Sequence, residues 1–176
     1  SELEELIRDI ERKLEKVKRD SERSMREIEE DLKRVRKKTE ESERRIRDLL
    51  DKVRKRKVDK DKLKRIKEEL RKLNKDHRDD IERIKRRLDK LNKEHREEIE
   101  RIKKELRELV KRVEDAGLDR TEDLRRVAKR VEEELDRSNE EHSKIVDKAK
   151  RDLDKSNKEH SKVVEDAERT LDRVED

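Results

Sequence analysis

"HRDDIERIKRRLDKLNKE" at residues 77–94 is followed directly by "HREEIERIKKELRELVKR" at residues 95–112. Both stretches carry histidine, isoleucine and leucine at the same places, so the sequence has an 18-residue repeat. The apolar residues lie three or four positions apart, a spacing that predicts an amphipathic α-helix. Eighteen residues equal five turns of 3.6 residues. A repeat of this length does not drift around the helix, and it therefore predicts nearly straight helices lying side by side.

The periodic pattern is interrupted first near residue 58. Asp59 is a suitable N-cap residue for a helix that follows it. Val58 and Leu63 flank it at the spacing of a hydrophobic staple. One helix is therefore expected at about 2–56, with a short turn after it.

The second interruption contains the single glycine of the chain, Gly117. Glycine suits the left-handed position that follows a helix end, and Leu118 is expected to fold back onto Val113 as in a Schellman motif. Asp119 is expected to cap the next helix, with Glu122 completing a capping box. The second and third helices should span about 60–115 and about 120–175.

Two short turns make neighbouring helices antiparallel. The sequence therefore predicts an all-α fold: a long, straight, antiparallel three-helix bundle with up-down-up topology. We expect residues 1–176 to form a single helical-bundle domain.

Composition narrows the class of protein. The chain is 63% charged and 26% apolar, and it has no proline, cysteine or aromatic residue. Such a charge content is typical of disordered chains. Here 58 basic and 53 acidic residues alternate and the apolar residues are periodic, which indicates long helices instead. The absence of cysteine excludes disulfides and thiolate metal sites.

The same composition argues against several partners. No apolar run is long enough to cross a membrane and no signal-peptide pattern opens the sequence, so we expect a soluble protein with no membrane partner. The net charge of +5 is small and dispersed, and no aromatic residue can stack on a base. We therefore expect no nucleic-acid partner.

Two nearly identical segments, "SNEEHSK" at 138–144 and "SNKEHSK" at 156–162, place polar residues where the apolar stripe should continue. Folding the chain at its two turns brings the polar positions of all three helices to two heights, roughly 27 Å apart. The first polar layer should contain Ser21, Ser24, Asn92, His95, Ser138, Asn139, His142 and Ser143. The second polar layer should contain Thr39, Ser42, Asn74, His77, Ser156, Asn157, His160 and Ser161.

A buried polar group without a partner costs about 1–3 kcal/mol. Neutral histidine, asparagine, serine and threonine carry donors and acceptors that can satisfy one another. The two layers are therefore expected to be hydrogen-bond networks, because a wrong register or neighbour would leave them half-satisfied.

The 18-residue repeat, the "SNKEHSK" layers, the Glu/Lys/Arg/Asp surfaces and endings such as "HSKVVEDAERTLDRVED" resemble a de novo designed helical bundle, built from parametric straight helices with buried hydrogen-bond networks. The resemblance covers the whole chain. It implies a structural scaffold with no natural activity, no enzyme chemistry and no cofactor. Designs of this class are monomers, homo-oligomers or heterodimer subunits, and some with buried histidines disassemble in acid.

The histidines allow three other interpretations: a zinc site, a Ser/His nucleophile and a pH response. Zinc prefers a tetrahedral set of ligands, but each layer offers two histidines and no cysteine. A Ser/His nucleophile needs an orienting group and an oxyanion site in a pocket, and a close-packed core leaves no cleft. Buried neutral histidines could instead make stability or assembly depend on pH. No metal or catalytic residue is therefore expected.

The last helix has a second, partial row of buried-type residues. This row could reach across a self-contained bundle, so that no partner is required. It could instead line a groove for a designed partner helix or for copies of the chain. The row contains Ala128, Asn139, Ser143, Val146, Asn157, Ser161 and Val164.

Overall fold

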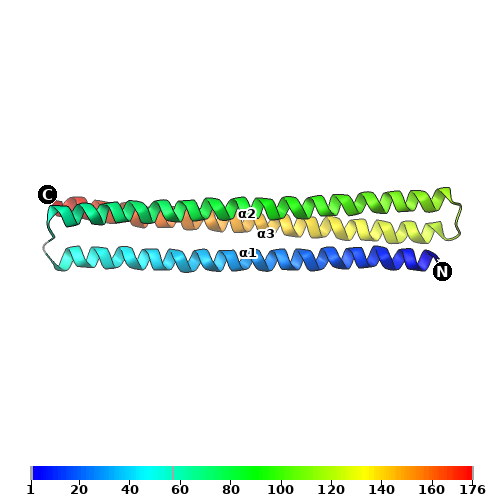
Figure 1. Ribbon diagram of the computed structural model, residues 1–176, viewed down its shortest axis with the longest axis horizontal. Coiled ribbons are helices and arrows are strands. Elements are labelled where there is room, and N and C mark those ends of the chain that lie inside the picture. The colour runs from blue at the N-terminus through cyan, green and yellow to red at the C-terminus, as the bar shows by residue number, and fades with distance from the viewer. Residues whose placement is uncertain (1, 57, 176) are drawn as a thin grey trace. The chain divides into compact units, whose positions relative to one another are not determined.

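The computed structural model describes residues 2–56 and 58–175, and these form three long helices. Helix α1 spans Glu2–Lys55, α2 spans Lys60–Asp115 and α3 spans Thr121–Glu175, joined by two short connections (Figure 1). The expected all-α fold of three bundled helices is confirmed. Across these residues, no helix carries a segment apolar enough to cross a membrane.

The contacts divide the chain into two compact units, and every helix contributes a segment to each. Unit 1 contains Ser1–Ile28 and Leu88–Asp147, and unit 2 contains Glu29–Arg87 and Lys148–Asp176. The single-domain expectation stays a prediction. Each polar layer falls within one unit: the first in unit 1 and the second in unit 2.

In unit 1, ion pairs show that α2 and α3 run antiparallel. Arg107 of α2 pairs with Glu132 of α3, and Lys103 pairs with Asp136, so residue numbers fall on α2 as they rise on α3. Apolar side chains from all three helices fill the centre, and burial of each large one contributes roughly 1.5–3 kcal/mol. The buried cluster consists of Leu3, Ile10, Leu14, Val17, Ile99, Ile102, Leu106, Val113, Leu124, Val131 and Leu135.

Unit 2 has the same arrangement. Lys38 of α1 pairs with Asp80 of α2 and Arg45 pairs with Glu69, so these two helices also run antiparallel. A second apolar cluster forms its core, again from all three helices. Its buried members are Ile46, Leu49, Val53, Leu63, Ile66, Leu70, Val164, Ala167 and Leu171.

The connection between α1 and α2 ends at Asp59, the N-cap residue that the sequence predicts. The Asp59 carboxylate accepts a hydrogen bond of 2.8 Å from the backbone N–H of Lys62. Val58 packs against the apolar cluster that contains Leu63. Asp59 is thus the N-cap of α2, because its side chain satisfies a backbone donor that the helix leaves unpaired.

The α2–α3 connection has the left-handed glycine that the sequence predicts. Gly117 has φ 64° and its N–H donates to the carbonyl of Glu114 over 3.1 Å. The expected contact of Leu118 with Val113 stays a prediction: Val113 is buried and Leu118 is 41% exposed. The chain leaves α2 through a left-handed glycine.

The cap of α3 lies one residue beyond Asp119, the cap residue that the sequence predicts. Helix α3 begins at Thr121, and the carbonyl of Arg120, rather than that of Asp119, accepts from the N–H groups of Asp123 and Leu124. Arg120 has φ 66°. This second left-handed residue redirects the chain after Gly117, so the cap position moves beyond Asp119.

Candidate functional site

All four histidines of the two polar layers are buried. His142 and His160 are 0% exposed, His95 is 5% and His77 is 6% exposed. Ser21 is also buried. The remaining members are partly buried: Ser24, Asn92, Ser138, Asn139 and Ser143 in the first layer, and Thr39, Ser42, Asn74, Ser156, Asn157 and Ser161 in the second.

His142 of α3 joins the other two helices in the first polar layer. Its Nε2 lies 2.8 Å from Ser24 Oγ of α1, and its Nδ1 lies 3.2 Å from Asn92 Oδ1 of α2. A carbonyl oxygen only accepts, so Nδ1 carries the proton and Nε2 of the neutral ring accepts from the Ser24 hydroxyl. Ser143 also donates to Asn92 Oδ1, over 3.2 Å. These bonds connect the three helices at one level of unit 1.

The second histidine of this layer packs against the first. The rings of His95 and His142 are stacked, with centroids 4.5 Å apart and planes at 27°. His95 Nε2 lies 3.3 Å from Ser138 Oγ of α3. Asn139 Oδ1 is buried without a hydrogen-bond partner. The first layer is therefore bonded across all three helices but leaves one acceptor unsatisfied.

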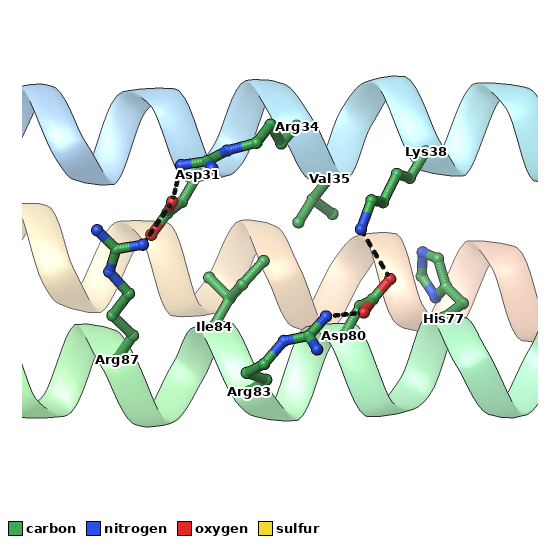
Figure 2. A pocket seen from close by; sticks show the side chains of 9 residues that line it. All are labelled: Asp31, Arg34, Val35, Lys38, His77, Asp80, Arg83, Ile84 and Arg87. Carbon is green, nitrogen blue, oxygen red and sulfur yellow. Dashed lines mark hydrogen bonds and ion pairs between the residues drawn. The ribbon is translucent and has the colours of Figure 1, made fainter.

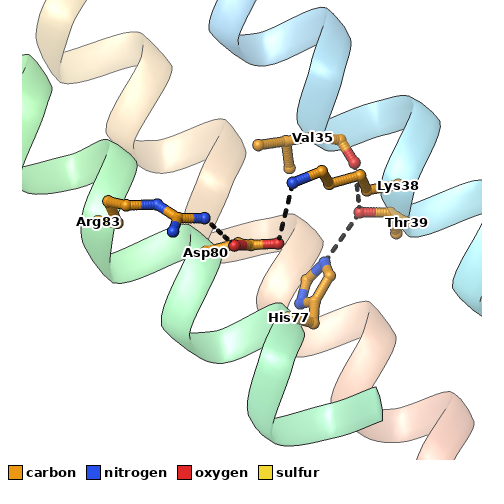
Figure 3. Close-up of polar contacts among 6 residues, drawn as sticks. All are labelled: Val35, Lys38, Thr39, His77, Asp80 and Arg83. Atoms are coloured by element: carbon orange, nitrogen blue, oxygen red, sulfur yellow. Dashed lines mark hydrogen bonds and ion pairs between the residues drawn. The ribbon is translucent and has the colours of Figure 1, made fainter.

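In the second polar layer, the Thr39 side chain contacts the backbone of Val35 and the ring of His77 (Figure 3). Its hydroxyl donates to the carbonyl of Val35 over 2.8 Å, and its Oγ1 lies 2.8 Å from His77 Nε2 and 3.4 Å from Ser156 Oγ. A hydroxyl has one proton. Since the Val35 carbonyl takes it, Thr39 accepts from His77, and His77 is protonated at Nε2.

His160 completes the second layer. Its Nε2 lies 2.7 Å from Ser42 Oγ, and its ring stacks on His77 with centroids 4.0 Å apart and planes at 9°. Ser161 donates to Asn74 Oδ1 over 3.3 Å.

The expectation that each layer saturates itself is not met in either layer, and the second layer leaves more atoms unsatisfied than the first. The Nδ1 atoms of His77 and His160 and the Oδ1 atom of Asn157 are buried without hydrogen-bond partners.

Burial makes these histidines weaker bases than usual. Burial, followed by the charge of the stacked His95, lowers the pKa of His142 from 6.5 to about 4. Burial and the charge of His77 lower the pKa of His160 to about 4 in the same way. In a low-dielectric site the charged form loses hydration, and two adjacent imidazolium ions repel each other. Near neutral pH both rings are therefore uncharged.

Burial also lowers the pKa values of the two partner histidines, and nearby groups oppose the shift. At His77 the side chain of Asn157 and the charge of Asp80 raise the pKa. At His95 a hydrogen bond to the backbone of Ser138 and the charge of Asp20 do so.

The ionised residues beside the two layers differ. Beside the second layer, Lys38 pairs with Asp80 over 3.5 Å. The corresponding positions beside the first layer, one repeat away on each helix, hold Asp20 and Glu98. Burial raises the pKa of Glu98, and the Asp20 carboxylate raises it further. Layers with the same histidines thus lie in different electrostatic surroundings.

A buried charge that the sequence analysis missed lies between α1 and α2 of unit 2. Asp31 is 2% exposed, and its Oδ1 lies 2.5 Å from Arg34 and 3.2 Å from Arg87 (Figure 2). Its Oδ2 has no hydrogen-bond partner. A cavity of about 270 Å³ adjoins it, with Val35 and Ile84 on its apolar wall.

The repeat contains a signal for this aspartate. Leu49 stands one repeat after Asp31 and is 3% exposed. Asp31 also follows Ile28 by three residues and precedes Val35 by four, which places it on the buried face of α1. Its position in the repeat predicts burial, and only its identity as an aspartate suggests a surface residue.

The acidic and histidine side chains do not form a metal-binding cluster in the part of the chain that the structure describes. In residues 2–56 and 58–175, no group of three histidine, aspartate or glutamate side chains is placed to hold a metal ion. Each layer contributes its histidines as a stacked pair.

No protein-family model matches the sequence, and no curated protein matches it. A solved structure described as "Computationally designed three helix bundle" is similar to 98% of this chain and 85% of its own chain, with 17% identity and a TM-score of 0.42. The chain itself is an all-α bundle of three long helices, with hydrogen bonds from buried histidines to serine and threonine.

Proposed function

We propose that this chain is an artificial structural scaffold in which the two polar layers specify which helices pair and in which register. The observation that carries the proposal is the position of His142. One ring of α3 bonds Ser24 of α1 through Nε2 and Asn92 of α2 through Nδ1. Displacing either neighbour breaks a buried hydrogen bond, and the atom left unpaired costs about 1–3 kcal/mol.

The experiment removes the layers and keeps the apolar core. One variant replaces all histidines and asparagines of both layers with leucine, the serines with alanine and Thr39 with valine. Shifted and exchanged pairings then bury apolar surface equally well. We expect a higher denaturation midpoint together with several species in native mass spectrometry and more than one set of amide peaks in NMR spectra.

The matched control is I81L/I99L, which changes two buried apolar residues and leaves the polar layers intact. It should remain one species with one set of peaks. A single well-ordered monomer from the apolar-layer variant would contradict the proposed role of the layers.

A second candidate function is pH-dependent assembly as a designed oligomer or heteromeric subunit. The lowered pKa values of His142 and His160 favour it, because acid would place charge inside the layers. Val146 and Val164, from the second row of α3, are each 1% exposed, which favours a self-contained bundle. Light scattering at pH 8 and pH 4.5 separates the two: pH-dependent assembly requires a change of mass.

A further inference from the structure

Three of the ion pairs between α2 and α3 recur at the interval of the repeat. Each has a lysine on α2 and an aspartate on α3. The pairs are Lys67–Asp172, Lys85–Asp154 and Lys103–Asp136. Because the polar layers recur at the same interval, moving one helix by one repeat would again place lysine against aspartate and histidine against histidine. These lysine–aspartate pairs and the stacked histidines therefore do not distinguish the native register of α2 on α3 from one that is shifted by a whole repeat.

The contacts between α1 and α2 do not repeat in this way. Lys13 of α1 pairs with Glu105 of α2 over 2.9 Å. One repeat further along α1, and one repeat back along α2, Asp31 pairs with Arg87 over 3.2 Å. The charges are reversed between these two pairs. The Asp31 side chain is 3% exposed whereas that of Lys13 is 46% exposed, so the reversed pair includes a buried carboxylate.

We propose that Asp31 fixes the register of α1 on α2 by excluding registers shifted by one repeat. Shifted in one direction, Asp31 would face Glu105; shifted in the other, it would face Glu69. Either arrangement places a second carboxylate against a buried one, which costs far more than the same contact in water. This inference rests on the proposed function, because the polar layers fix the register only to within one repeat.

The neighbouring Lys38–Asp80 pair does not exclude the register in which Asp31 would face Glu105. Lys38 pairs with Asp80, and a shift by one repeat in one direction would place it against Glu98, another carboxylate. Arg34 lies on the same helix as Asp31 and accompanies it in every register (Figure 2). At this position the discrimination therefore comes from the residue that α2 presents to Asp31.

The decisive variant is D31K/R87E. It gives this position the lysine–glutamate polarity of Lys13–Glu105, so the native register keeps an ion pair. The introduced lysine would also face a glutamate in both shifted registers, Glu105 in one and Glu69 in the other. The ion pair between positions 31 and 87 is kept with reversed polarity, although the contact of Arg34 with Asp31 is lost, and the like-charge contact of position 31 in the shifted registers is removed.

Disulfide trapping can report the register, because the chain has no cysteine of its own. K38C/D80C reports the native register, and K38C/E98C reports the register shifted by one repeat. Each pair is placed in the wild-type and D31K/R87E backgrounds. The proteins are refolded from denaturant in a thiol–disulfide redox buffer and analysed by non-reducing electrophoresis and native mass spectrometry.

We expect D31K/R87E to raise the K38C/E98C cross-linked fraction about tenfold over the wild-type background, mainly as dimers of staggered copies. The matched control K13E/D31K/R87E/E105K reverses both pairs. It restores a like-charge contact in this shifted register, so its cross-linked fraction should return to the wild-type level.

Equal K38C/E98C cross-linking in the wild-type and D31K/R87E backgrounds, with K38C/D80C forming in both, would overturn the role of Asp31. That outcome would leave the proposed function standing, because these variants retain both polar layers. The apolar-layer variant tests those layers separately.

Discussion

The imidazole rings of His77 and His160 are nearly parallel, with centroids 4.0 Å apart and 9° between their planes. This packing is favourable for two neutral rings. It opposes protonation, because a charge on one ring lies against the other in a buried site. The stacked histidine pairs therefore make the stability of the buried core depend on pH.

Acid should destabilise the fold between about pH 6.5 and pH 4. The pKa values of His142 and His160 are lowered to about 4, so below pH 6.5 the unfolded chain binds protons that the folded chain does not. The stabilisation is complete above the unfolded pKa and is lost as pH falls through the folded pKa, amounting to about 3 kcal/mol per histidine at most. Urea unfolding curves at half-unit pH intervals would measure the loss.

The double variant H142L/H160L provides the control for this dependence. Its stability should change less over the same pH range, whatever its stability at pH 8. Parallel pH profiles for the wild type and the double variant would show that other groups cause the effect.

Asn92 and Asn139 should respond differently to truncation. Asn92 Oδ1 accepts hydrogen bonds from His142 and Ser143, whereas Asn139 Oδ1 is buried without a partner. N92A should lower the free energy of unfolding by about 1–3 kcal/mol, because it leaves buried donors unpaired. N139A should cost less, since no acceptor bond is lost. Guanidinium denaturation of both variants checks the difference, and equal losses would contradict it.

The two turn aspartates should also differ. D59A removes the N-cap of α2 and should cost about 1 kcal/mol. D119A should change stability by less than half of that, because Arg120 and not Asp119 occupies the cap position of α3. Thermal unfolding followed by circular dichroism would compare them. A larger loss for D119A would support the cap that the sequence predicts.

Replacing Asp31 with leucine should stabilise the chain. Leu49 occupies the corresponding position one repeat later and is 3% exposed, and Asp31 Oδ2 has no partner. Exchanging a buried charge for a well-packed apolar side chain is often neutral or stabilising by about 1–4 kcal/mol. Arg34 and Arg87 are 63% and 46% exposed, so water can solvate them.

The control for this change is D31N, which keeps the size and polarity of the side chain but removes its charge. It should lower the free energy of unfolding in urea. A loss of stability in D31L as large as that in D31N would show that the ion pair stabilises the native state on balance.

The sequence predicts the helices well because their periodic pattern is long and uninterrupted. Asp59 and Gly117 were predictable as well, since capping and left-handed backbone favour particular residue types. The cap position of α3 was not, because it depends on the left-handed conformation of Arg120, and arginine has no preference for that region. Helix boundaries therefore follow from the sequence where residue types favour the local backbone, and less readily where they do not.

The hydrogen bonds within the polar layers could not be predicted from the repeat. Repeated segments suggest equal layers, yet His142 bonds Asn92 through Nδ1 while Nδ1 of His160 has no partner. Such differences depend on small shifts of side chains, which a repeat does not specify. Asp31 escaped prediction because its charge suggests a surface residue, although its place in the repeat does not.

The recurring Lys67–Asp172, Lys85–Asp154 and Lys103–Asp136 contacts have a practical consequence. Since each is spaced by whole turns, an additional cassette of one repeat inserted into every helix at matching points would continue the same contacts without rotating any face. The α2–α3 hairpin can thus be lengthened in steps of one 18-residue repeat, by inserting copies of the same cassette.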